Sequence, residues 1–570
     1  MAAESEMEMD EAEFPEIYRK IAMLGASRLV SLLDRRPWSP TYGCLDREYW
    51  HYKTLIEFPR AVYQQGVLSL ALLHRYPFEG NVFFGRPEVF DWVRASIRFW
   101  ATSQNRDGSS NEWYLHERSF CATAFTAWAI SESLLLLRES GEEEFVSEAL
   151  PPFLRATSWL ESRSNPLVAN QMAASLAALC NAFLLTNDPL RRQSYEKRKC
   201  EVLGMQREEG WFSEYLGADI GYSFLILDLL GHVGKRMADD ALKRSLERLL
   251  VFLGYFIHPD GTAGGVYGNR GTSHCFPYGM ELLAAIGNPT ARWMAGRLRR
   301  AVAEGRVATP LTVDDQYMAY FYLNSFTLAA ALGDGRATGG GGPSLGPWIV
   351  HRNRYFDEAG ILVRESGDSY AVVNAKKGGV WRAHGKEMKV HGDAGYVMVL
   401  QDGRCLSSQR LGPDATVRFK EEGDGSCELS IETPFCELDM SLPLVKWVVP
   451  FKIFSKWILR LTIFASLFGI VLKKVKIMRR NDSEVELKRR FRFGDGVMEI
   501  QDTIHSSQPI RIRDLMLNPG LPVVHSPSSQ LFESVIGLTP QVSRDWDPRA
   551  AVKELEGGQF GMIRRIPFAS

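Results

Sequence analysis

The feature that most constrains the fold is a loop pattern that recurs along the first half of the chain. In each copy a glutamine or histidine precedes an acidic residue, a glycine and then aromatic or small residues, at 104–113, 206–215 and 258–267. The gaps between their starts are 102 and 52 residues, so a unit of about 51 residues fits both. The same unit predicts breaks near 155 and 310, where 161–166 and 309–312 are rich in helix-interrupting residues. The chain therefore contains a structural repeat.

Apolar stretches of helical length lie between these loops, at 119–138, 170–185, 222–233, 241–256 and 315–332. Two helices with their loops fill one unit. Five or six such hairpins can close into an (α/α) toroid or stay open as a solenoid. Because the loops are rich in Trp, Tyr, Asn and Glu, which suit the floor of a ligand cleft, we expect the toroid, with alternate loops meeting at one rim.

The helical pattern stops at a glycine-rich stretch, and the remaining sequence has the pattern of strands. Short runs at 370–373, 395–400 and 484–493 are bounded by Asp-Gly and Gly-Asp turns. We therefore expect an α+β multidomain chain, with an N-terminal (α/α) toroid of helix hairpins followed by a C-terminal antiparallel β-sandwich. The expected boundaries are 1–336 for the toroid, as the catalytic domain, 337–347 for the linker and 348–570 for the β-sandwich.

One segment of the β domain, 447–476, does not fit a strand pattern. It is strongly apolar, and its uninterrupted part, 461–472, falls well short of the roughly 20 residues that span a bilayer. It ends in Lys473, Lys474 and Lys476. One interpretation is a buried helix inserted into the β domain. The other is a peripheral anchor, with the basic residues facing lipid headgroups.

Composition narrows the function classes. The 67 basic and 68 acidic side chains leave a formal net charge of −1, and no basic stripe marks the helical part, so we expect no nucleic acid partner. The eight cysteines are scattered without a CxxC pair, which is typical of reduced thiols. The first residues, MAAESEMEMDEAEF, are acidic where a signal peptide would be basic and then apolar. We expect a cytoplasmic protein without a signal peptide, associated with membranes if 447–476 is an anchor.

The second loop and the helix after it carry the densest set of polar and aromatic side chains. Glu214, Tyr215, Asp219 and Tyr222 are expected near the mouth of the toroid, with Trp211 just before them. As an alternative, the acids cap the helix and the tyrosines pack with their hydroxyls at the surface.

Candidates on other units join this group. Asn170 precedes Tyr222 by 52 residues, so the two should lie at the same height on neighbouring inner helices, unless Asn170 is a plain N-cap. Arg270 can bind both oxygens of a carboxylate. His274 and His116 are open to a structural or a catalytic role. Further candidates for substrate contact are Trp113, Tyr114, Glu117 and Tyr267.

The domain order, the helix led by Asn170 and the Glu-Gly…Glu…Tyr segment that ends at Tyr222 resemble the heparinase II/III-like polysaccharide lyases and their alginate-lyase relatives. Those lyases have a histidine after the asparagine, where this chain has Gln171. Their His-x-Asp element early in the β domain resembles His391-Gly-Asp393. Some relatives bind a metal there, so a divalent metal at His391 and Asp393 is a candidate cofactor.

The resemblance implies a carbon-oxygen lyase that performs β-elimination at a uronic acid, so the expected partner is an acidic polysaccharide or oligosaccharide. Asn170 and Arg270 would pair with the substrate carboxylate and so make the C5 proton more acidic. Tyr222 would be one member of the acid and base pair, and His274 or His116 the other.

Three other functions stay open. A glycoside hydrolase on the same toroid would take its two carboxylates from Glu117, Glu209, Glu214 and Asp219. A non-catalytic glycan-binding protein would fit Gln171. Isoprenoid cyclases and prenyltransferases share the toroid, but they need an Asp-rich or metal site in an apolar cavity, and only Asp314-Asp315 hints at one.

Overall fold

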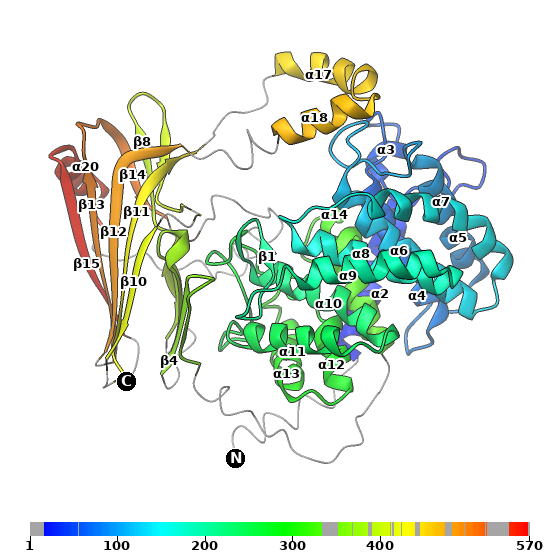
Figure 1. Ribbon diagram of the computed structural model, residues 1–570, viewed down its shortest axis with the longest axis horizontal. Helices are drawn as coiled ribbons and strands as arrows, with labels where there is room; N and C mark the ends of the chain where they lie inside the picture. Colours follow the sequence, from blue (N-terminus) through cyan, green and yellow to red (C-terminus); the bar gives the residue numbers. More distant parts are fainter. Residues whose placement is uncertain are drawn as a thin grey trace.

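The computed structural model describes residues 16–332 except 55, and residues 352–567 with gaps at 367–368, 386–389, 411, 413–414, 423–424, 439–444, 473–480, 495, 519 and 521–545. The predicted linker, 337–347, and the end of the apolar segment, 473–476, lie outside these residues. A helical domain lies on one side of the molecule and a layered β domain on the other (Figure 1).

The helical domain is a closed ring of helix hairpins, as the repeat predicts. The inner helices are α4 (Val67–Arg75), α6 (Phe120–Glu139), α8 (Ala169–Thr186), α10 (Ile220–Arg236), α12 (Tyr278–Ala285) and α15 (Leu323–Ala331). Each inner helix packs on the next, and α15 packs on α4, which closes the toroid. The outer helices are α2 (Glu16–Leu32), α5 (Pro87–Ser103), α7 (Glu143–Glu161), α9 (Pro189–Leu203), α11 (Asp240–Gly254) and α13 (Pro289–Ala303).

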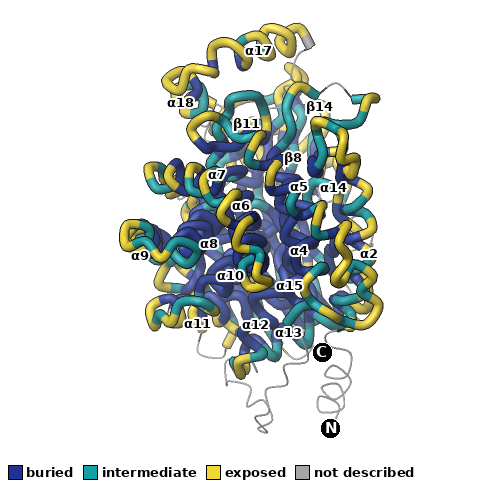
Figure 2. Tube along the Cα trace, turned by 90° about the vertical axis from the view of Figure 1, so that its right-hand side faces the viewer, coloured by how far each residue is buried: buried dark blue, intermediate teal, exposed yellow. Residues whose placement is uncertain are grey.

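Inner and outer helices differ in the width of their apolar surface. α6 is buried from Ala122 to Leu137 without a break, whereas α11 buries only a stripe that includes Leu242, Leu246 and Leu253. Figure 2 shows this as a buried centre within a ring that is exposed on its outside. In the described chain α6 is also the one helix long and apolar enough to cross a membrane, and 89% of its apolar window is buried, as suits a core helix of the ring.

A glycine in each repeat loop explains the recurring pattern. Gly108, Gly210 and Gly261 have φ of 90°, 103° and 78°, which other residues rarely adopt. A Cβ at each would lie 2.5 Å from a carbonyl atom of the outer helix that follows, at Arg155, Arg248 and Arg297 in turn. The repeat thus fixes how closely each loop approaches its outer helix.

Short elements complete the rim of the toroid. They are α3 (Arg47–Trp50), the 3₁₀ helix η1 (Ala61–Gly66), the hairpin of β1 (Ser213–Glu214) with β2 (Gly217–Ala218), α14 (Asp315–Tyr317) and the π-helical η2 (Met318–Tyr322). The single helix predicted at 315–332 is therefore three consecutive pieces. Its π-helical turn is a type of irregularity that is often found at functional sites.

The β domain is a sandwich of two antiparallel sheets, as predicted. The first sheet runs β3 (Arg354–Phe356), β4 (Ile361–Ser366), β5 (Ser369–Asn374), β6 (Val380–His384) and β7 (Val390–Asp393). The second runs β14 (Ile512–Leu517), β8 (Tyr396–Leu400), β9 (Cys405–Ser407), β11 (Cys427–Glu437), β12 (Asp482–Gly494), β13 (Val497–Ser506) and β15 (Gln559–Pro567), with β10 (Thr416–Glu421) paired to β11. The helix α20 (Pro548–Glu556) packs on β14 and β15, and the 3₁₀ helix η3 (Ala375–Lys377) follows β5.

The first sheet is buried on both faces because it lies between the toroid and the second sheet. Along β4, Ile361 and Val363 belong to the toroid core, whereas Leu362 packs with the second sheet. Along β5, Val372 and Val373 divide in the same way. This near-continuous apolar pattern ties the β domain firmly to the toroid.

The apolar segment of the β domain forms two helices, α17 (Val445–Trp457) and α18 (Thr462–Leu472). The interpretation of one helix buried in the β domain is wrong, because most of the large side chains of this pair are exposed and the pair lies against the rim of the toroid. Figure 1 shows the two helices apart from both sheets, beside the end of the ring that carries α3.

Candidate functional site

A cleft of about 540 Å³ opens at the rim where the loops of the toroid meet. Its lining residues are Leu32, Asp46, Arg47, Glu48, His51, Thr54, Tyr63, Glu112, Trp113, Asp314, Asp315, Gln316, Tyr317 and Tyr320. Arg60 pairs with Asp46 and Glu48, and Arg28 pairs with Asp315 at 2.6 Å. The cleft is therefore less negative than its composition suggests.

Tyr317 lines the cleft and connects it to two predicted catalytic residues that do not line it themselves. The Tyr317 ring lies 5.8 Å from the ring of His274, and His274 lies 5.8 Å from the ring of Tyr222, between centres. The hydroxyl of Tyr320 lies 2.5 Å from the thiol of Cys121 on α6. Aromatic side chains from α10, α14 and η2 thus converge at the end of the toroid axis.

Tyr222 and His274 both keep a polar atom without a protein partner. No described residue bonds to the Tyr222 hydroxyl, and burial raises the pKa of this tyrosine well above its usual value. His274 shares a hydrogen bond between Nδ1 and the Tyr322 hydroxyl, while its buried Nε2 is unpaired. Burial lowers the pKa of His274 to about 3, so its imidazole is neutral. The pair therefore offers a protonated phenol beside a neutral imidazole.

Glu214 lies in the second loop at a strained turn. The two residues after it, Tyr215 and Leu216, have φ of 51° and 73° in the β1–β2 hairpin, a conformation that costs free energy for residues other than glycine. Glu214 accepts hydrogen bonds from the Asn170 amide and from the N–H of Ala169, the latter at 3.0 Å. Burial, assisted by Asp219, raises the pKa of Glu214 to about 8. This carboxyl is mostly protonated at neutral pH.

Asn170 is therefore not a helix cap. The N-cap position of α8 is Val168, which has no side-chain hydrogen bond. The amide of Asn170 instead donates to the carboxyl group of Glu214 in the next repeat unit. This contact is possible because Asn170 and the second loop belong to neighbouring units. Gln171, at the position of the family's histidine, accepts a hydrogen bond from Asn165 at 2.8 Å and belongs to the preceding loop.

Arg270 contributes a cation to the same rim. Its backbone N–H donates to Asp219 at 2.6 Å, and its guanidinium lies 4.9 Å from the centre of the Tyr215 ring. The guanidinium makes no hydrogen bond or ion pair with any residue that the structure describes. Asp219 also caps α10 and bonds to Thr272, so it positions the loop and does not face the cleft. Arg270 is available to an anionic ligand.

The β domain holds the loop that carries Arg270. The ammonium group of Lys377, in η3, donates to the carbonyls of Val266 and Gly268 at 2.8 and 2.6 Å. The amide of Asn374 donates to the carbonyl of Tyr267 at 2.7 Å. Burial lowers the pKa of Lys377 to about 7. The position of Arg270 thus depends on a domain that follows it in the sequence.

The first loop places its candidates differently from one another. Trp113 lines the cleft and is 75% exposed. Glu117 accepts from the N–H groups of Glu112 and Trp113, at 2.9 and 2.7 Å, and burial raises its pKa to about 7. Tyr114 packs between Phe451 and Phe468 of the helix pair, away from the cleft. Of these three, only Trp113 is directly available to a ligand.

His116 lies apart from the other catalytic candidates. It has φ of 63°, and its Nδ1 is 3.4 Å from the side-chain oxygen of Asn105 in the same loop. No contact within the described chain joins it to Tyr222 or His274. Of the two histidines, His274 packs against the ring of Tyr222, whereas His116 contacts residues of the first loop.

Three aromatic or acidic candidates have structural contacts. Trp211 is buried and donates to Glu209 at 2.9 Å. Glu209 also accepts from the N–H groups of Glu358 and Ala359, so it links the toroid to the β domain. Tyr267 is fully buried, and its hydroxyl is 2.8 Å from Nε2 of His258. None of the three lines the cleft.

The metal candidate in the β domain does not fit a cation. His391 is half-buried on β7, and Asp393 is enclosed by cationic and N–H donors. The donors to its two oxygens, at 2.6 to 2.8 Å, are Trp381, Gly395, Arg489 and Arg564. Four donors use the lone pairs of the carboxylate, so a metal would have to displace an arginine.

In the described chain one other group has metal-ligand geometry, formed by His258, Asp260 and His384 between the two domains. Both nitrogens of His258 are already bonded, at 2.8 Å, to the hydroxyls of Thr262 and Tyr267. The nearby guanidinium of Arg382 helps to lower the pKa of both histidines and would repel a cation. These side chains fit a polar contact between domains better than a metal centre.

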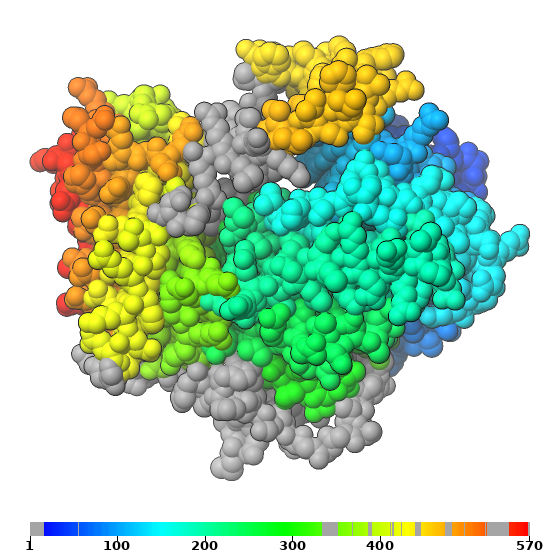
Figure 3. Space-filling model, viewed as in Figure 1, coloured from blue at the N-terminus to red at the C-terminus, as the bar shows by residue number. Residues whose placement is uncertain are grey.

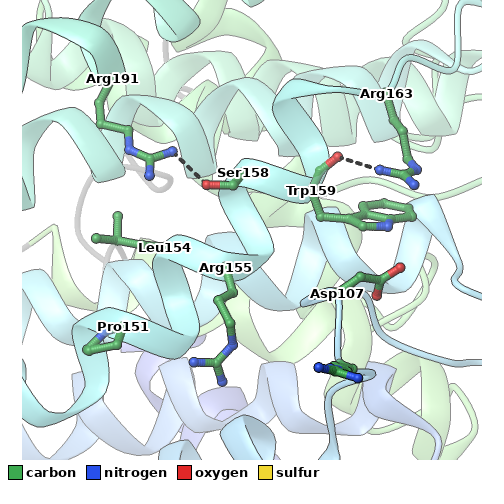
Figure 4. A pocket seen from close by; sticks show the side chains of 9 residues that line it. Asp107, Pro151, Leu154, Arg155, Ser158, Trp159, Arg163 and Arg191 are labelled. Carbon is green, nitrogen blue, oxygen red and sulfur yellow. Dashed lines mark hydrogen bonds between the residues drawn. The ribbon is translucent and has the colours of Figure 1, made fainter.

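A second hollow, of about 470 Å³, lies on the outer side of α7 (Figure 4). It is lined by Arg106, Arg155, Arg163 and Arg191, among others. Arg191 pairs with Glu161 at 2.6 Å, and Arg163 lies over Trp159 and donates to its carbonyl. Because this hollow is open and none of the candidate catalytic groups reaches it, the rim cleft is the better candidate site.

The sequence alone did not identify Glu112, Lys377 or the η2 tyrosines, Tyr320 and Tyr322, as residues of the site. Glu112 could have been found, because it follows the loop glycine Gly108 by four residues, as Glu214 follows Gly210. Burial and Glu117 raise the pKa of Glu112 to about 8, close to that of Glu214. Lys377 lies in another domain, and no spacing rule connects it with the third loop.

No protein-family model and no curated protein match this chain. Solved structures do resemble it. A chondroitin AC lyase from Streptomyces coelicolor A3, in complex with chondroitin sulphate, has a TM-score of 0.49 and 12% identity, over 89% of this chain and 67% of the lyase. A heparinase III has a TM-score of 0.45 and 11% identity, over 78% and 63% of the two chains.

A β-L-arabinofuranosidase from Geobacillus stearothermophilus T6, a glycoside hydrolase, matches at a TM-score of 0.36 and 12% identity, over 97% of this chain and 95% of the hydrolase. The solved structures that resemble this chain include polysaccharide lyases and a glycoside hydrolase. A heparinase III, of the kind that the sequence resembles, is among them.

Proposed function

We propose that this protein is a polysaccharide lyase that cleaves a uronic-acid-containing glycan by β-elimination at the rim cleft. The observation that carries the proposal is the convergence at one rim of three groups that have no hydrogen-bond partner among the residues the structure describes. They are the guanidinium of Arg270, the hydroxyl of Tyr222 and Nε2 of His274. A carboxylate-binding cation, an acid and a base are what elimination next to a carboxylate requires.

The proposed reaction begins with the substrate carboxylate bound to Arg270. The cation stabilises the negative charge that spreads onto the carboxylate as the C5 proton leaves. Nε2 of His274 takes that proton, the C4–O bond breaks, and the electron pair of the C5–H bond forms the C4=C5 double bond. Tyr222 protonates the departing oxygen. Because an anionic substrate raises the pKa of a neighbouring histidine, substrate binding would strengthen His274 as a base.

The neutral state of Glu214 and Glu112 supports an anionic substrate. Both have a pKa of about 8, so at neutral pH they do not repel a uronate as two carboxylates would. Asn170, whose amide binds Glu214, is assigned a positioning role in place of direct contact with the substrate.

The test is a screen of uronate-containing polymers for product that absorbs in the ultraviolet, which the new double bond creates. Tyr222→Phe should lose about 10²–10⁴-fold in turnover. Tyr195→Phe is the matched control, because the Tyr195 hydroxyl is also buried without a partner but lies on the outer helix α9. Absence of ultraviolet product from every uronate polymer would contradict the proposal.

A glycoside hydrolase is the second candidate, and the raised pKa values of Glu112 and Glu214 favour it. Burial raises the pKa of the Cys121 thiol, and the charges of both carboxyls raise it further, so both lie near that residue. One would act as the acid and the other as the base. This reaction would create a reducing end without ultraviolet absorbance, and a glycan-binding protein would retain the polymer without changing it.

We also propose a cytoplasmic protein with a peripheral membrane contact through 447–476. Its eight cysteines are all free, as is usual in a reducing compartment. No step of the proposed reaction uses a metal, since the residues of the β domain that resemble a metal site do not fit one. Incubation with a chelator should leave turnover unchanged, and a loss restored by a divalent metal would contradict this part of the proposal.

A further inference from the structure

The helix pair α17–α18 carries the largest group of exposed apolar side chains in the described chain. They are Trp447, Val448, Val449, Ile453, Trp457, Ile458, Leu461, Ile463, Phe464, Leu467, Ile470, Val471 and Leu472. Figure 2 shows both helices as mostly exposed, in contrast to the buried inner helices of the ring. A monomeric soluble protein rarely leaves a continuous apolar surface of this size uncovered.

The pair is nevertheless attached to the toroid by specific contacts. The guanidinium of Arg118 donates to the carbonyls of Leu459 and Arg460, both at 2.8 Å. The ring of Tyr114 packs between Phe451 and Phe468, at 5.4 and 5.7 Å between centres. The exposed faces therefore belong to an element that is held in a defined position.

These contacts attach the pair to the wall of the cleft. Tyr114 and Arg118 lie in the first loop, which also supplies Glu112 and Trp113 to the cleft lining. In Figure 3 the pair forms the top of the molecule above this part of the toroid. Whatever covers the apolar faces of the pair will lie next to the mouth of the cleft.

Charge identifies the covering surface. The range 445–472 contains Lys446, Lys452, Lys456 and Arg460 and no aspartate or glutamate, and 473–480 adds five more basic residues in sequence. Of these cations, Lys452 pairs with Glu57 of the toroid at 3.7 Å. Apolar helices whose own charges are all positive fit an anionic lipid surface, and Trp447 and Trp457 are residues typical of the membrane interface.

The length of the helices excludes a span. α18 has 11 residues and so extends about 16 Å, roughly half the thickness of the hydrocarbon core. α17 contains Pro450 and three lysines. The pair can lie in the interface but cannot cross the bilayer.

We propose that α17 and α18 dock on an anionic lipid bilayer and hold the cleft at its surface, so that the glycan cleaved there is one carried by a membrane. The substrate part of this inference rests on the proposed lyase activity. The docking part does not, because it follows from the exposed faces and the charges of the pair alone.

The first experiment measures binding of the full chain to vesicles by co-sedimentation. Vesicles of phosphatidylcholine with phosphatidylglycerol should bind the protein, and phosphatidylcholine alone should bind it more weakly. The triple variant Trp447→Glu, Trp457→Glu, Ile463→Glu changes side chains that are 63%, 65% and 74% exposed. It should lose about tenfold or more in vesicle affinity while its thermal unfolding is unchanged.

The matched control carries Trp38→Glu, Val82→Glu and Leu190→Glu, three apolar side chains of the toroid that are 83%, 65% and 70% exposed. It should bind vesicles as the unaltered chain does. Equal loss in both triple variants, or no vesicle binding by the unaltered chain, would overturn the docking proposal. Dimerisation that the first triple variant abolishes, without vesicle binding, would assign the faces to a second copy and would also overturn it.

The second experiment compares one uronate polymer free in solution and coupled to a lipid in vesicles. We expect about tenfold faster turnover of the coupled polymer, and we expect the first triple variant to lose this gain while it cleaves the free polymer normally. Vesicle binding without turnover of either form would contradict the lyase and leave the docking intact. Equal turnover of both forms by a vesicle-bound enzyme would contradict the membrane-borne substrate.

Discussion

The first and third repeat loops begin with the same geometry and end in different surroundings. Gly108 and Gly261 have similar φ, and each approaches the backbone of its outer helix in the same way. Beyond the glycine, the first loop opens into the cleft and supports α17–α18, whereas the third is covered by the β domain until it reaches Arg270. The comparison teaches that a repeat sets the local path of the chain, and that the segment packed on each loop sets its function.

The largest expected effect separates the arginines of the two loops. Arg270→Met should lower turnover of a free uronate polymer by about 10²–10³-fold, because it removes the cation that stabilises the developing charge. Arg118→Met removes the bonds to α17–α18 and the contacts with His116 and Asp107 within the first loop. Because none of these contacts involves Tyr222 or His274, turnover should stay within about threefold. Initial rates by ultraviolet absorbance measure both. Equal losses in the two variants would remove the distinction between the loops.

The next effect tests how the third loop is held. Lys377→Met should destabilise the protein by about 3 kcal/mol, because it leaves buried carbonyls of the third loop without a donor. Lys376→Met is the control, since the neighbouring Lys376 donates to carbonyls at an exposed site and should cost under ~1 kcal/mol. Denaturant unfolding measures both values. Similar values for the two lysines would show that the β domain does not hold the loop through Lys377.

The pH dependence of stability should have opposite signs for Glu112, in the first loop, and for Lys377, which holds the third loop from the β domain. The folded pKa of Lys377, about 7, lies below its usual 10.5, so the unfolded chain binds the extra proton between these values and this group raises stability as pH rises. The folded pKa of Glu112, about 8, lies above its usual 4.5, so the folded chain binds the extra proton and this group lowers stability as pH rises.

Glu112→Gln should therefore be about as stable as the unaltered chain at pH 5 and ~4 kcal/mol more stable at pH 9. Unfolding across this range measures the difference. The same difference for Lys377→Met should become more negative as pH rises, since the unaltered chain gains stability there. A Glu112→Gln difference that does not change with pH would contradict the buried, protonated state of Glu112.

The smallest effect concerns Trp113, the exposed aromatic residue of the first loop. Trp113→Ala should change the free energy of unfolding by less than ~0.5 kcal/mol, because the side chain is largely in solvent. Its loss of stacking area should weaken glycan binding by about fivefold. Titration with the polymer that proves to be the substrate measures this. Unchanged affinity would place the sugar away from the first loop.

The sequence could predict the helices and much of the rim, because both depend on neighbouring residues. The boundaries of α6, α8 and α10 lie within a few residues of the predicted ranges. Asn170, Tyr222 and Arg270 could be chosen because one repeat separates each from the next. The sequence could not predict that Trp211, Tyr267 and Tyr114 would be packed away from the cleft. An aromatic residue in a loop gives the same sequence pattern whether it faces a cleft or is covered by another segment.

By itself the sequence determined the repeat, the turn glycines and the toroid followed by a β domain, because backbone preference and periodic burial are properties of short segments. Only the tertiary structure decided which loop stays open, that Lys377 holds the loop of Arg270, and that Glu112 and Glu214 are protonated near neutral pH. These depend on desolvation and contacts among segments far apart in the chain. The sequence shows that 447–472 is apolar, but it does not predict that these side chains are exposed, because burial depends on what packs against a helix.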